Sequence, residues 1–113
     1  MHELAITQSM FDLVMQQAEE AKAKKIAKIN LVIGEMTGVI SDSVQFYFDF
    51  FSKGTIAEEA TLSFLMVAPK TRCLDCNRLF GLKEFDWRCP YCGGSNLQIV
   101  AGKELFVESI EVE

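Results

Sequence analysis

The stretches Cys73-Leu74-Asp75-Cys76 and Cys89-Pro90-Tyr91-Cys92 are two Cys-x-x-Cys pairs separated by 12 residues. Each pair can place two thiolates on one side of a tetrahedron, which is the coordination geometry that zinc prefers. The first pair is followed by Asn77 and the second by Gly93 and Gly94, and these residues tolerate the positive φ that a tight metal knuckle requires. The two pairs therefore predict a zinc ribbon.

The ligands of this predicted site follow from the composition of the chain. The only histidine is His2, far from the cysteines, so a complete tetrahedral site here consists of Cys73, Cys76, Cys89 and Cys92. Four thiolates leave no open position for water, so the site is expected to be structural. Two alternatives remain open: iron in the same thiolates, or a redox-active dithiol pair without metal.

The residues around the cysteines are predicted to form short strands and to make an insertion in a larger fold. Residues 79–81 and 86–88 have strand-like sequences between the two pairs. After the ribbon, 106–112 reads as a strand with acidic residues at its exposed edge. A single strand is not stable without partner strands, so we expect it to return and pair with strands that precede the ribbon.

Upstream of the ribbon, the chain alternates between helical and extended patterns. Apolar residues recur at helical spacing over 4–22, and the lysines that follow suit a helix C-terminus. Ile29, Leu31 and Ile33 alternate as on a half-buried strand, and a second alternating run, 62–66, stops before a proline. These patterns predict one helix and two strands.

A second helix is predicted between these strands, ending near Gly54. Asp42 is the expected N-cap, with Gln45 completing a capping box. The apolar positions include Phe46 and Phe50 on a second flank, so we expect the helix to be covered on more than one side. The aromatic residues of 47–51 are expected in the core.

Together the elements predict an α+β fold, with two helices packed on a small three-stranded sheet and an inserted four-cysteine zinc ribbon. The expected division is an α+β domain formed by 1–69 and 100–113, and a zinc-ribbon domain formed by 70–99. A chain of 113 residues, half of them apolar, is long enough for one such core.

Bulk properties narrow the function. No secretory signal or membrane-length apolar run is present, so we expect a cytoplasmic protein with reduced cysteines. A net charge of −5 argues against a general nucleic-acid binder. However, residues 70–99 hold five Lys or Arg against three acidic residues, so a zinc-ribbon adaptor for nucleic acid or a transcription complex stays an alternative. No phosphate loop or nucleophile-elbow motif is present, so we expect no enzymatic activity.

The chain opens with Met1-His2-Glu3, which has chelating chemistry. The α-amine of Met1, the amide nitrogen of His2 and its imidazole can close adjacent chelate rings around one ion. Nitrogen donors in a plane suit Ni(II) or Cu(II). Glu3 follows directly and can contribute its backbone nitrogen or a carboxylate acceptor beside the ion.

These features together resemble the HypA/HybF family of hydrogenase nickel-incorporation proteins. The resemblance rests on Met1-His2-Glu3 at the start of a helix, Ile33-Gly34-Glu35 at the end of a strand, Thr37-Gly38-Val39 after it, and the two cysteine pairs before a last strand. It runs in order along essentially the whole chain.

The resemblance implies a nickel metallochaperone for [NiFe]-hydrogenase maturation, and in some members for urease. It implies nickel as cargo at His2 with the backbone nitrogens of His2 and Glu3, and structural zinc in the four cysteines. It also implies a nickel-handling GTPase and the hydrogenase large-subunit precursor as partners, and we add a homodimer as a further expectation. The other nickel donors stay open between the amine of Met1, an acid such as Glu3 or Asp42, and water.

Overall fold

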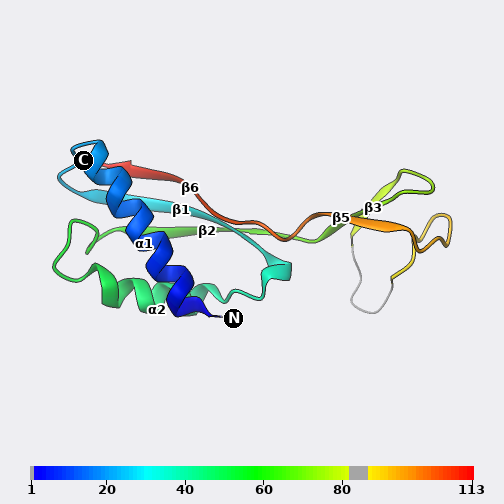
Figure 1. Ribbon diagram of the computed structural model, residues 1–113, viewed down its shortest axis with the longest axis horizontal. Helices are drawn as coiled ribbons and strands as arrows, with labels where there is room; N and C mark the ends of the chain where they lie inside the picture. Colours follow the sequence, from blue (N-terminus) through cyan, green and yellow to red (C-terminus); the bar gives the residue numbers. More distant parts are fainter. Residues whose placement is uncertain (1, 82–86) are drawn as a thin grey trace.

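The computed structural model describes residues 2–81 and 87–113. Two three-stranded sheets lie end to end, so the molecule is elongated, with extents of 55 × 24 × 17 Å (Figure 1). The elements, in chain order, are α1 (Glu3–Glu20), β1 (Ile26–Gly34), the 3₁₀ turn η1 (Glu35–Thr37), α2 (Ser41–Ser52), β2 (Thr61–Val67), β3 (Lys70–Cys73), β4 (Leu79–Gly81), β5 (Leu97–Ala101) and β6 (Leu105–Val112).

The larger sheet has the strand order β2-β1-β6. β2 runs parallel to the central β1, and α2 forms the connection between them, whereas β6 pairs with β1 in the antiparallel sense. The predicted return of the C-terminal strand to this sheet is confirmed. The return is favoured because β2 pairs with only one edge of β1 and leaves the other edge free. In addition, β6 cannot form a stable sheet alone.

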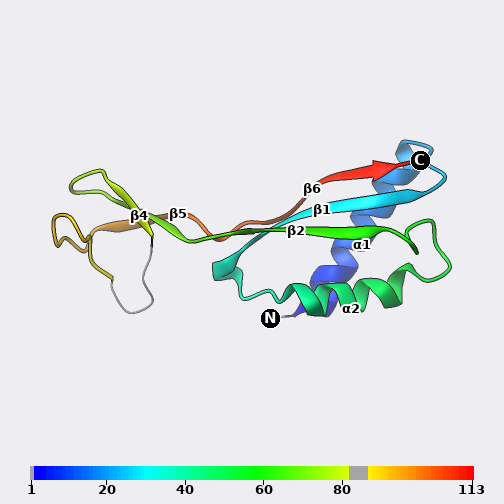
Figure 2. The same cartoon turned by 180° about the vertical axis from the view of Figure 1, so that it is seen from behind.

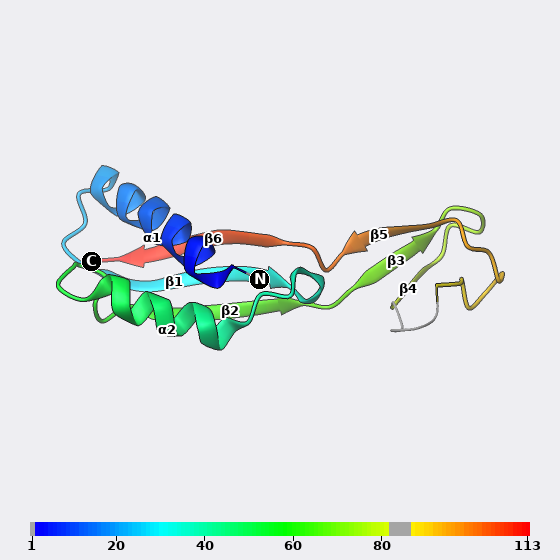
Figure 3. The ribbon, with the colours of Figure 1, turned by 60° about the horizontal axis from the view of Figure 1, so that its bottom comes forward.

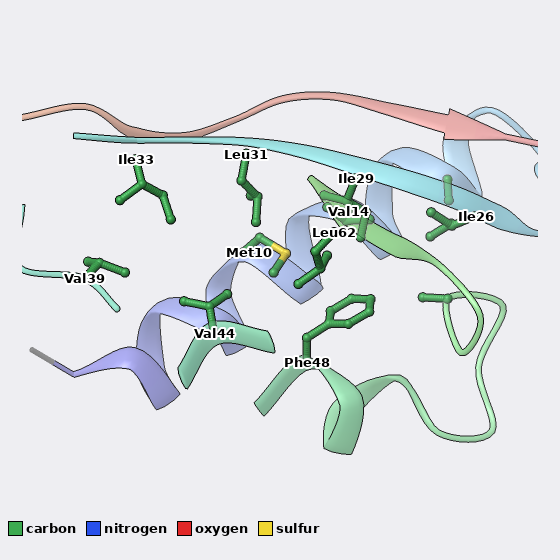
Figure 4. Close-up of a cluster of buried hydrophobic side chains, with 12 residues drawn as sticks. Met10, Val14, Ile26, Ile29, Leu31, Ile33, Val39, Val44, Phe48 and Leu62 are labelled. Atoms are coloured by element: carbon green, nitrogen blue, oxygen red, sulfur yellow. The ribbon is translucent and has the colours of Figure 1, made fainter. Parts of the chain in front are cut away.

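Both helices cover one face of this sheet (Figures 2 and 3). As predicted from their alternation, Ile29 and Ile33 of β1 are buried, and they join Val14 of α1 and Phe48 of α2 in one apolar cluster (Figure 4). On the opposite face, no described element covers the sheet, and Leu65 is 58% exposed there. The α+β fold with two helices on one sheet is therefore as expected.

The first helix is two residues shorter than the expected 4–22 at its C-terminal end, because a Schellman turn stops it. Lys22 adopts φ +55°, its N–H bonds to the carbonyl of Glu19, and the N–H of Ala23 bonds to the carbonyl of Ala18. The lysines therefore follow the helix, and its last turn contains no basic residue. Charge at a helix end did not decide where the helix stops; a left-handed residue did.

The prediction of a capping box in the second helix was wrong. The N-cap is Ile40, Asp42 lies inside the first turn, and no side chain caps the helix. Gln45 instead donates to the Asp49 carboxylate at 2.8 Å. The first-turn aspartate still complements the partial positive charge of the helix N-terminus.

The expected cover on a second flank of this helix was also wrong. Only Val44, Phe48 and Ser52 are buried, while Phe46 and Phe50 are 68% and 70% exposed. Amphipathic spacing identifies the stripe that faces the core, but α1 and the sheet together contact only one side of α2. The two phenylalanines therefore remain at the surface.

The smaller sheet has the order β4-β3-β5, with both outer strands antiparallel to β3. The predicted strand 79–81 is confirmed. Within the predicted strand 86–88, residue 86 lies outside the described residues, and Trp87 and Arg88 are not in a strand. The third strand is instead β5, in which half-buried and exposed residues alternate. The alternation of apolar and polar residues over Leu97-Gln98-Ile99 was a usable signal for this strand that went unread.

The two sheets meet where two glycine backbones touch. The N–H of Gly34 donates to the carbonyl of Glu104 at 2.6 Å, and the N–H of Met36 donates to that of Gly102 at 2.8 Å. A Cβ at Gly34 would collide with the carbonyl of Gly102, so only glycine permits this approach.

In the described part of the chain, neither helix is both long and apolar enough to span a bilayer.

Candidate metal centres

The first cysteine pair forms a tight knuckle at the end of β3. The N–H of Cys73 donates to the carbonyl of Arg78 at 2.9 Å, and the N–H of Asn77 donates to the carbonyl of Cys73 at 2.7 Å. Asn77 has φ +62°, in the left-handed region that the sequence predicted for it. This turn places Cys76 on the same side as Cys73.

The second pair repeats the same hydrogen-bond pattern. The N–H of Cys89 donates to the carbonyl of Gly94 at 2.8 Å, and the N–H of Gly93 donates to the carbonyl of Cys89 at 2.9 Å. Gly93 has φ +73°, as the knuckle requires. The amide of Tyr91 also points at the sulfur of Cys89, 3.4 Å away. Amide donors to sulfur favour the thiolate form that binds metals.

The two knuckles bring the four cysteine sulfurs into one cluster. The sulfurs of Cys73 and Cys92 are 3.5 Å apart, those of Cys76 and Cys89 are 3.6 Å apart, and all four lie within 4.8 Å of one another. A tetrahedron with Zn–S bonds of about 2.3 Å has edges of about 3.8 Å. The donor set and its spacing therefore fit a four-thiolate metal ion. Cys73 and Cys89 are buried, which keeps water from two of the four ligands.

The thiols resist ionising together when no cation balances their charge. Burial opposes ionisation of Cys89, but the amides of Cys92 and Tyr91 lower the pKa of its thiol to about 7. At Cys92 the amide of Gly94 favours the thiolate, but the neighbouring sulfur of Cys73 and desolvation outweigh it and raise the pKa to about 12. A divalent cation removes this conflict, because it stabilises all four thiolates at once.

A contact between the knuckles adds to the cluster. The guanidinium of Arg78 lies over the ring of Tyr91, 4.9 Å from its centroid, which is a cation–π geometry. Arg78 follows the first knuckle and Tyr91 belongs to the second, so the pair links the two halves of the ribbon. Nothing in the sequence indicates this contact, because residues 13 positions apart give no periodic signal.

At the other candidate site, His2 is the exposed N-cap of α1. Its backbone carbonyl accepts the first helical hydrogen bond, from the N–H of Ile6 at 3.1 Å, and its side chain makes no capping bond. The imidazole is therefore available to solvent. Met1 lies outside the described residues.

Glu3 has a specific structural partner near this end of the helix. Its carboxylate accepts a hydrogen bond from the N–H of Ile40 at 3.2 Å, which ties the start of α1 to the start of α2. Hydrogen bonds from its own backbone N–H and from that of Ile40 hold the pKa of the Glu3 carboxyl below its usual value. Asp42, the other acid considered as a nickel donor, is exposed in the first turn of α2.

The loop that presents Ile40 to Glu3 is held by Thr37 and Gly38. The Thr37 hydroxyl donates to the carbonyl of Gly34 at 2.8 Å and accepts from the N–H of Val39 at 3.1 Å. Gly38 has φ +74°, which permits the turn. The segment 37–39, notable in the sequence only through the family resemblance, thus positions the backbone next to Glu3.

A four-thiolate ribbon joined to a two-helix α+β body, with an exposed histidine at the start of the first helix, defines a small metal-binding protein. The family model described as "Hydrogenase/urease nickel incorporation, metallochaperone, hypA" matches residues 1–112. The chain belongs to this HypA family.

Curated relatives agree with the family model over nearly all of their length. The hydrogenase maturation factor HypA of Caldanaerobacter subterraneus subsp. tengcongensis is 46% identical, with both chains covered completely. That of Dehalococcoides mccartyi (strain ATCC BAA-2266) is also 46% identical and is covered to 95%, with this chain covered completely.

Solved structures share the fold. A solution structure of HypA protein superposes with a TM-score of 0.76 at 25% identity, covering 100% of this chain and 97% of that one. The solution structure of the nickel metallochaperone HypA from Helicobacter pylori gives a TM-score of 0.67 at 25% identity, with coverage of 99% and 97%. The resemblance predicted from the sequence is therefore confirmed.

Proposed function

We propose that this protein is a nickel metallochaperone that binds Ni(II) at its N-terminus and delivers it during [NiFe]-hydrogenase maturation. The observation that carries the proposal is the family match over residues 1–112, to a family described as incorporating nickel into hydrogenase or urease. Urease is therefore a second candidate recipient. The relatives named above are called hydrogenase maturation factors, which favours hydrogenase.

In this proposal His2 is the principal nickel ligand, through its imidazole and its backbone nitrogen. The exposed position of His2 supports the assignment, because a carrier must pass its ion to another protein. The backbone nitrogen of Glu3 and the amine of Met1 complete a nitrogen-rich set of the kind that suits Ni(II). We assign the Glu3 carboxylate a place beside the ion. Its hydrogen bond from the N–H of Ile40 holds the first turn of the helix in place.

The resident metal is zinc, held by Cys73, Cys76, Cys89 and Cys92. The close sulfur cluster and its two matched knuckles support this assignment. Zinc supplies folding energy here and no reaction chemistry, because the four thiolates complete its coordination.

The proposal also covers the partner proteins, the cellular compartment and the domain division of this protein. The chain is a carrier without enzymatic activity, so a nickel-handling GTPase of the maturation pathway supplies nucleotide hydrolysis and the hydrogenase large-subunit precursor receives the metal. We place the protein in the cytoplasm and propose that it can form a homodimer. We propose a nickel-binding domain formed by residues 1–69 with 100–113 and a zinc ribbon formed by 70–99, whose last strand β5 continues to Ala101.

Isothermal titration calorimetry tests the nickel site. Nickel is titrated into untagged, zinc-loaded protein and into His2→Ala, with Gln8→Ala as a matched control. Gln8 is an exposed residue of the same helix. We expect about one nickel per chain for the wild type and the control, and none for His2→Ala.

A variant with a Gly-Ser extension before Met1 separates the two kinds of nitrogen donor. Weaker binding by this variant assigns the α-amine as a ligand. Equal nickel binding by wild type and His2→Ala would overturn the proposed site and leave the zinc-ribbon adaptor as the better account.

A further inference from the structure

The outward face of α2 carries the two most exposed large apolar side chains in the described part of the chain, Phe46 and Phe50, at 68% and 70%. They are four residues apart, so they lie on one side of the helix and form a single stripe. Neither is used by the metal centres. Exposed apolar patches of this kind commonly mark interaction sites.

The stripe is supported by packing that reaches the core. The Phe50 ring lies edge-on to that of Phe51 at 5.9 Å, Phe51 packs on Phe11 at 6.2 Å, and Phe11 packs on the buried Phe48 at 6.2 Å. Aromatic rings held in this way lose little conformational entropy when a partner binds, which makes them effective anchors.

A second aromatic contact supports the other end of the stripe. The ring of Phe46 lies edge-on to that of Tyr47, with centroids 5.4 Å apart and planes at 75°. Tyr47 is half-buried on the side of α2 that turns toward the core. Both exposed phenylalanines are thus backed by a neighbouring ring rather than left without support.

The charge around the stripe indicates what can cover it. All charged side chains within α1 and α2 are acidic: Glu3, Asp12, Glu19, Glu20, Asp42 and Asp49. Asp42 and Asp49 lie on the same flank of the stripe, at helical positions beside Phe46 and Phe50, and Gln45 bonds to Asp49. Among the described residues, no ion pair involves these acids.

This combination selects one class of occupant. Acids repel an anionic membrane surface and nucleic acid, and they repel a second copy of the same face in a two-fold pairing. A helix with an apolar stripe flanked by Lys or Arg matches both the aromatic and the acidic parts. We propose that the outer face of α2 docks a basic amphipathic helix of a partner protein, with its apolar stripe on Phe46 and Phe50 and its cations facing Asp42 and Asp49.

Of the residues in this proposal only Asp42 is also a candidate nickel donor, so the test is run without nickel and the proposal stands or fails separately from the cargo site. The test uses zinc-loaded, ¹⁵N-labelled protein and three designed 18-residue peptides. The first has leucine on one helical face and lysine on its flanks. The second replaces each lysine by glutamate, and the third scrambles the first so that no apolar stripe remains.

We expect amide shifts confined to α2 with the lysine peptide, and none with the other two. Phe46→Ser and Phe50→Ser should each weaken binding about tenfold or more, as expected for aromatic anchors. Leu65→Ser is the matched control, because Leu65 is 58% exposed on the uncovered sheet face, and it should bind as the wild type does. Asp42→Asn with Asp49→Asn should weaken binding and reduce its salt dependence.

Several results would overturn the proposal. These are equal binding of the glutamate peptide, shifts centred outside α2, or phenylalanine variants that bind as tightly as the wild type. Self-association or binding to anionic vesicles that Phe50→Ser abolishes, without any binding of the lysine peptide, would assign the face to a second copy or a lipid surface instead. Circular dichroism of each variant verifies the fold, and the aspartate variants test the proposal independently if a serine variant unfolds.

Discussion

Glu3 joins the starts of both helices through its bond to the backbone of Ile40. The bond places the proposed nickel ligand His2 at the first turn of a helix that is fixed at that end. An exposed imidazole on a fixed helix start can exchange its ion with a partner without unfolding the body. In the proposed nickel site the carboxylate contributes position, and the nitrogen donors contribute affinity.

The pH dependence of nickel binding separates these two contributions. Nitrogen donors must lose protons before they bind a metal, and imidazoles ordinarily hold a proton below about pH 6.5. We expect nickel binding to fade below about pH 6 in calorimetric titrations. The Glu3 contact should persist there, because its two backbone hydrogen bonds lower the carboxyl pKa.

The lowered pKa of the Glu3 carboxyl determines how its contact with Ile40 responds to acid. A carboxyl whose pKa is lower in the folded protein contributes stability above its unfolded pKa and loses it as the pH falls through the folded value. The NMR chemical shift of the Ile40 amide should therefore stay unchanged while nickel is lost, and should change only in more acidic solution. Nickel retained unchanged at about pH 5 would contradict the nitrogen donor set.

At the scale of elements, α2 has two faces that the sequence pattern could not tell apart. Phe48 is 1% exposed, whereas Phe50, two residues later, is 70% exposed. We expect Phe48→Ala to lower the free energy of unfolding by about 3–5 kcal/mol, because it leaves a cavity in the core. Phe50→Ala should cost less than about 1.5 kcal/mol, mainly through its edge contact with Phe51. Urea denaturation of both variants measures the difference, and equal costs would mean that Phe50 is covered in solution.

The junction between the two sheets depends on Gly34. Gly34→Ala places a methyl group against the carbonyl of Gly102, and a backbone atom cannot turn aside as a side chain can. We expect the free energy of unfolding to fall by about 2–3 kcal/mol, as for other forced overpacking. Gly81→Ala is the matched control, because a Cβ there meets no atom within 4 Å. Similar stability of both variants would show that the junction can shift to admit the methyl group.

At the scale of the whole molecule, two small sheets are stabilised by different means. The larger sheet has two helices over one face and a contiguous apolar cluster. The smaller sheet has short strands, and among the described residues of the ribbon the buried ones are chiefly Cys73, Cys89 and Thr71. Small units with so little buried apolar surface need a metal or a disulfide to fold.

Cys73→Ala tests the expected division of the chain. Three thiolates no longer complete the tetrahedron, so we expect loss of zinc and unfolding of the ribbon, while the far-UV helical signal remains. Trp87 is the single tryptophan and lies in the ribbon, so its emission reports the ribbon alone. Leu74→Ala, at an exposed neighbouring position, is the control and should retain zinc. Loss of the helical signal together with the tryptophan change would show that the two parts fold as one unit.

Local patterns in the sequence were sufficient for much of this protein. The cysteine spacing predicted both knuckles, including the left-handed residues Asn77 and Gly93, because a metal knuckle is built from consecutive residues. Alternating and helical periodicity located both helices and the strands of the larger sheet. The chain order of motifs was enough to identify the family, which the family model then confirmed.

Tertiary structure decided what depends on contacts between distant segments. The pairing of β5 with β3 and the bond from Glu3 to Ile40 arise between residues that no short pattern connects. The exposure of Phe46 and Phe50 is of the same kind: helical spacing assigns residues to faces, but only the position of α1 and the sheet determines which faces are covered. Sequence periodicity encodes the direction of a side chain relative to its own element, and burial depends on what the rest of the chain places there.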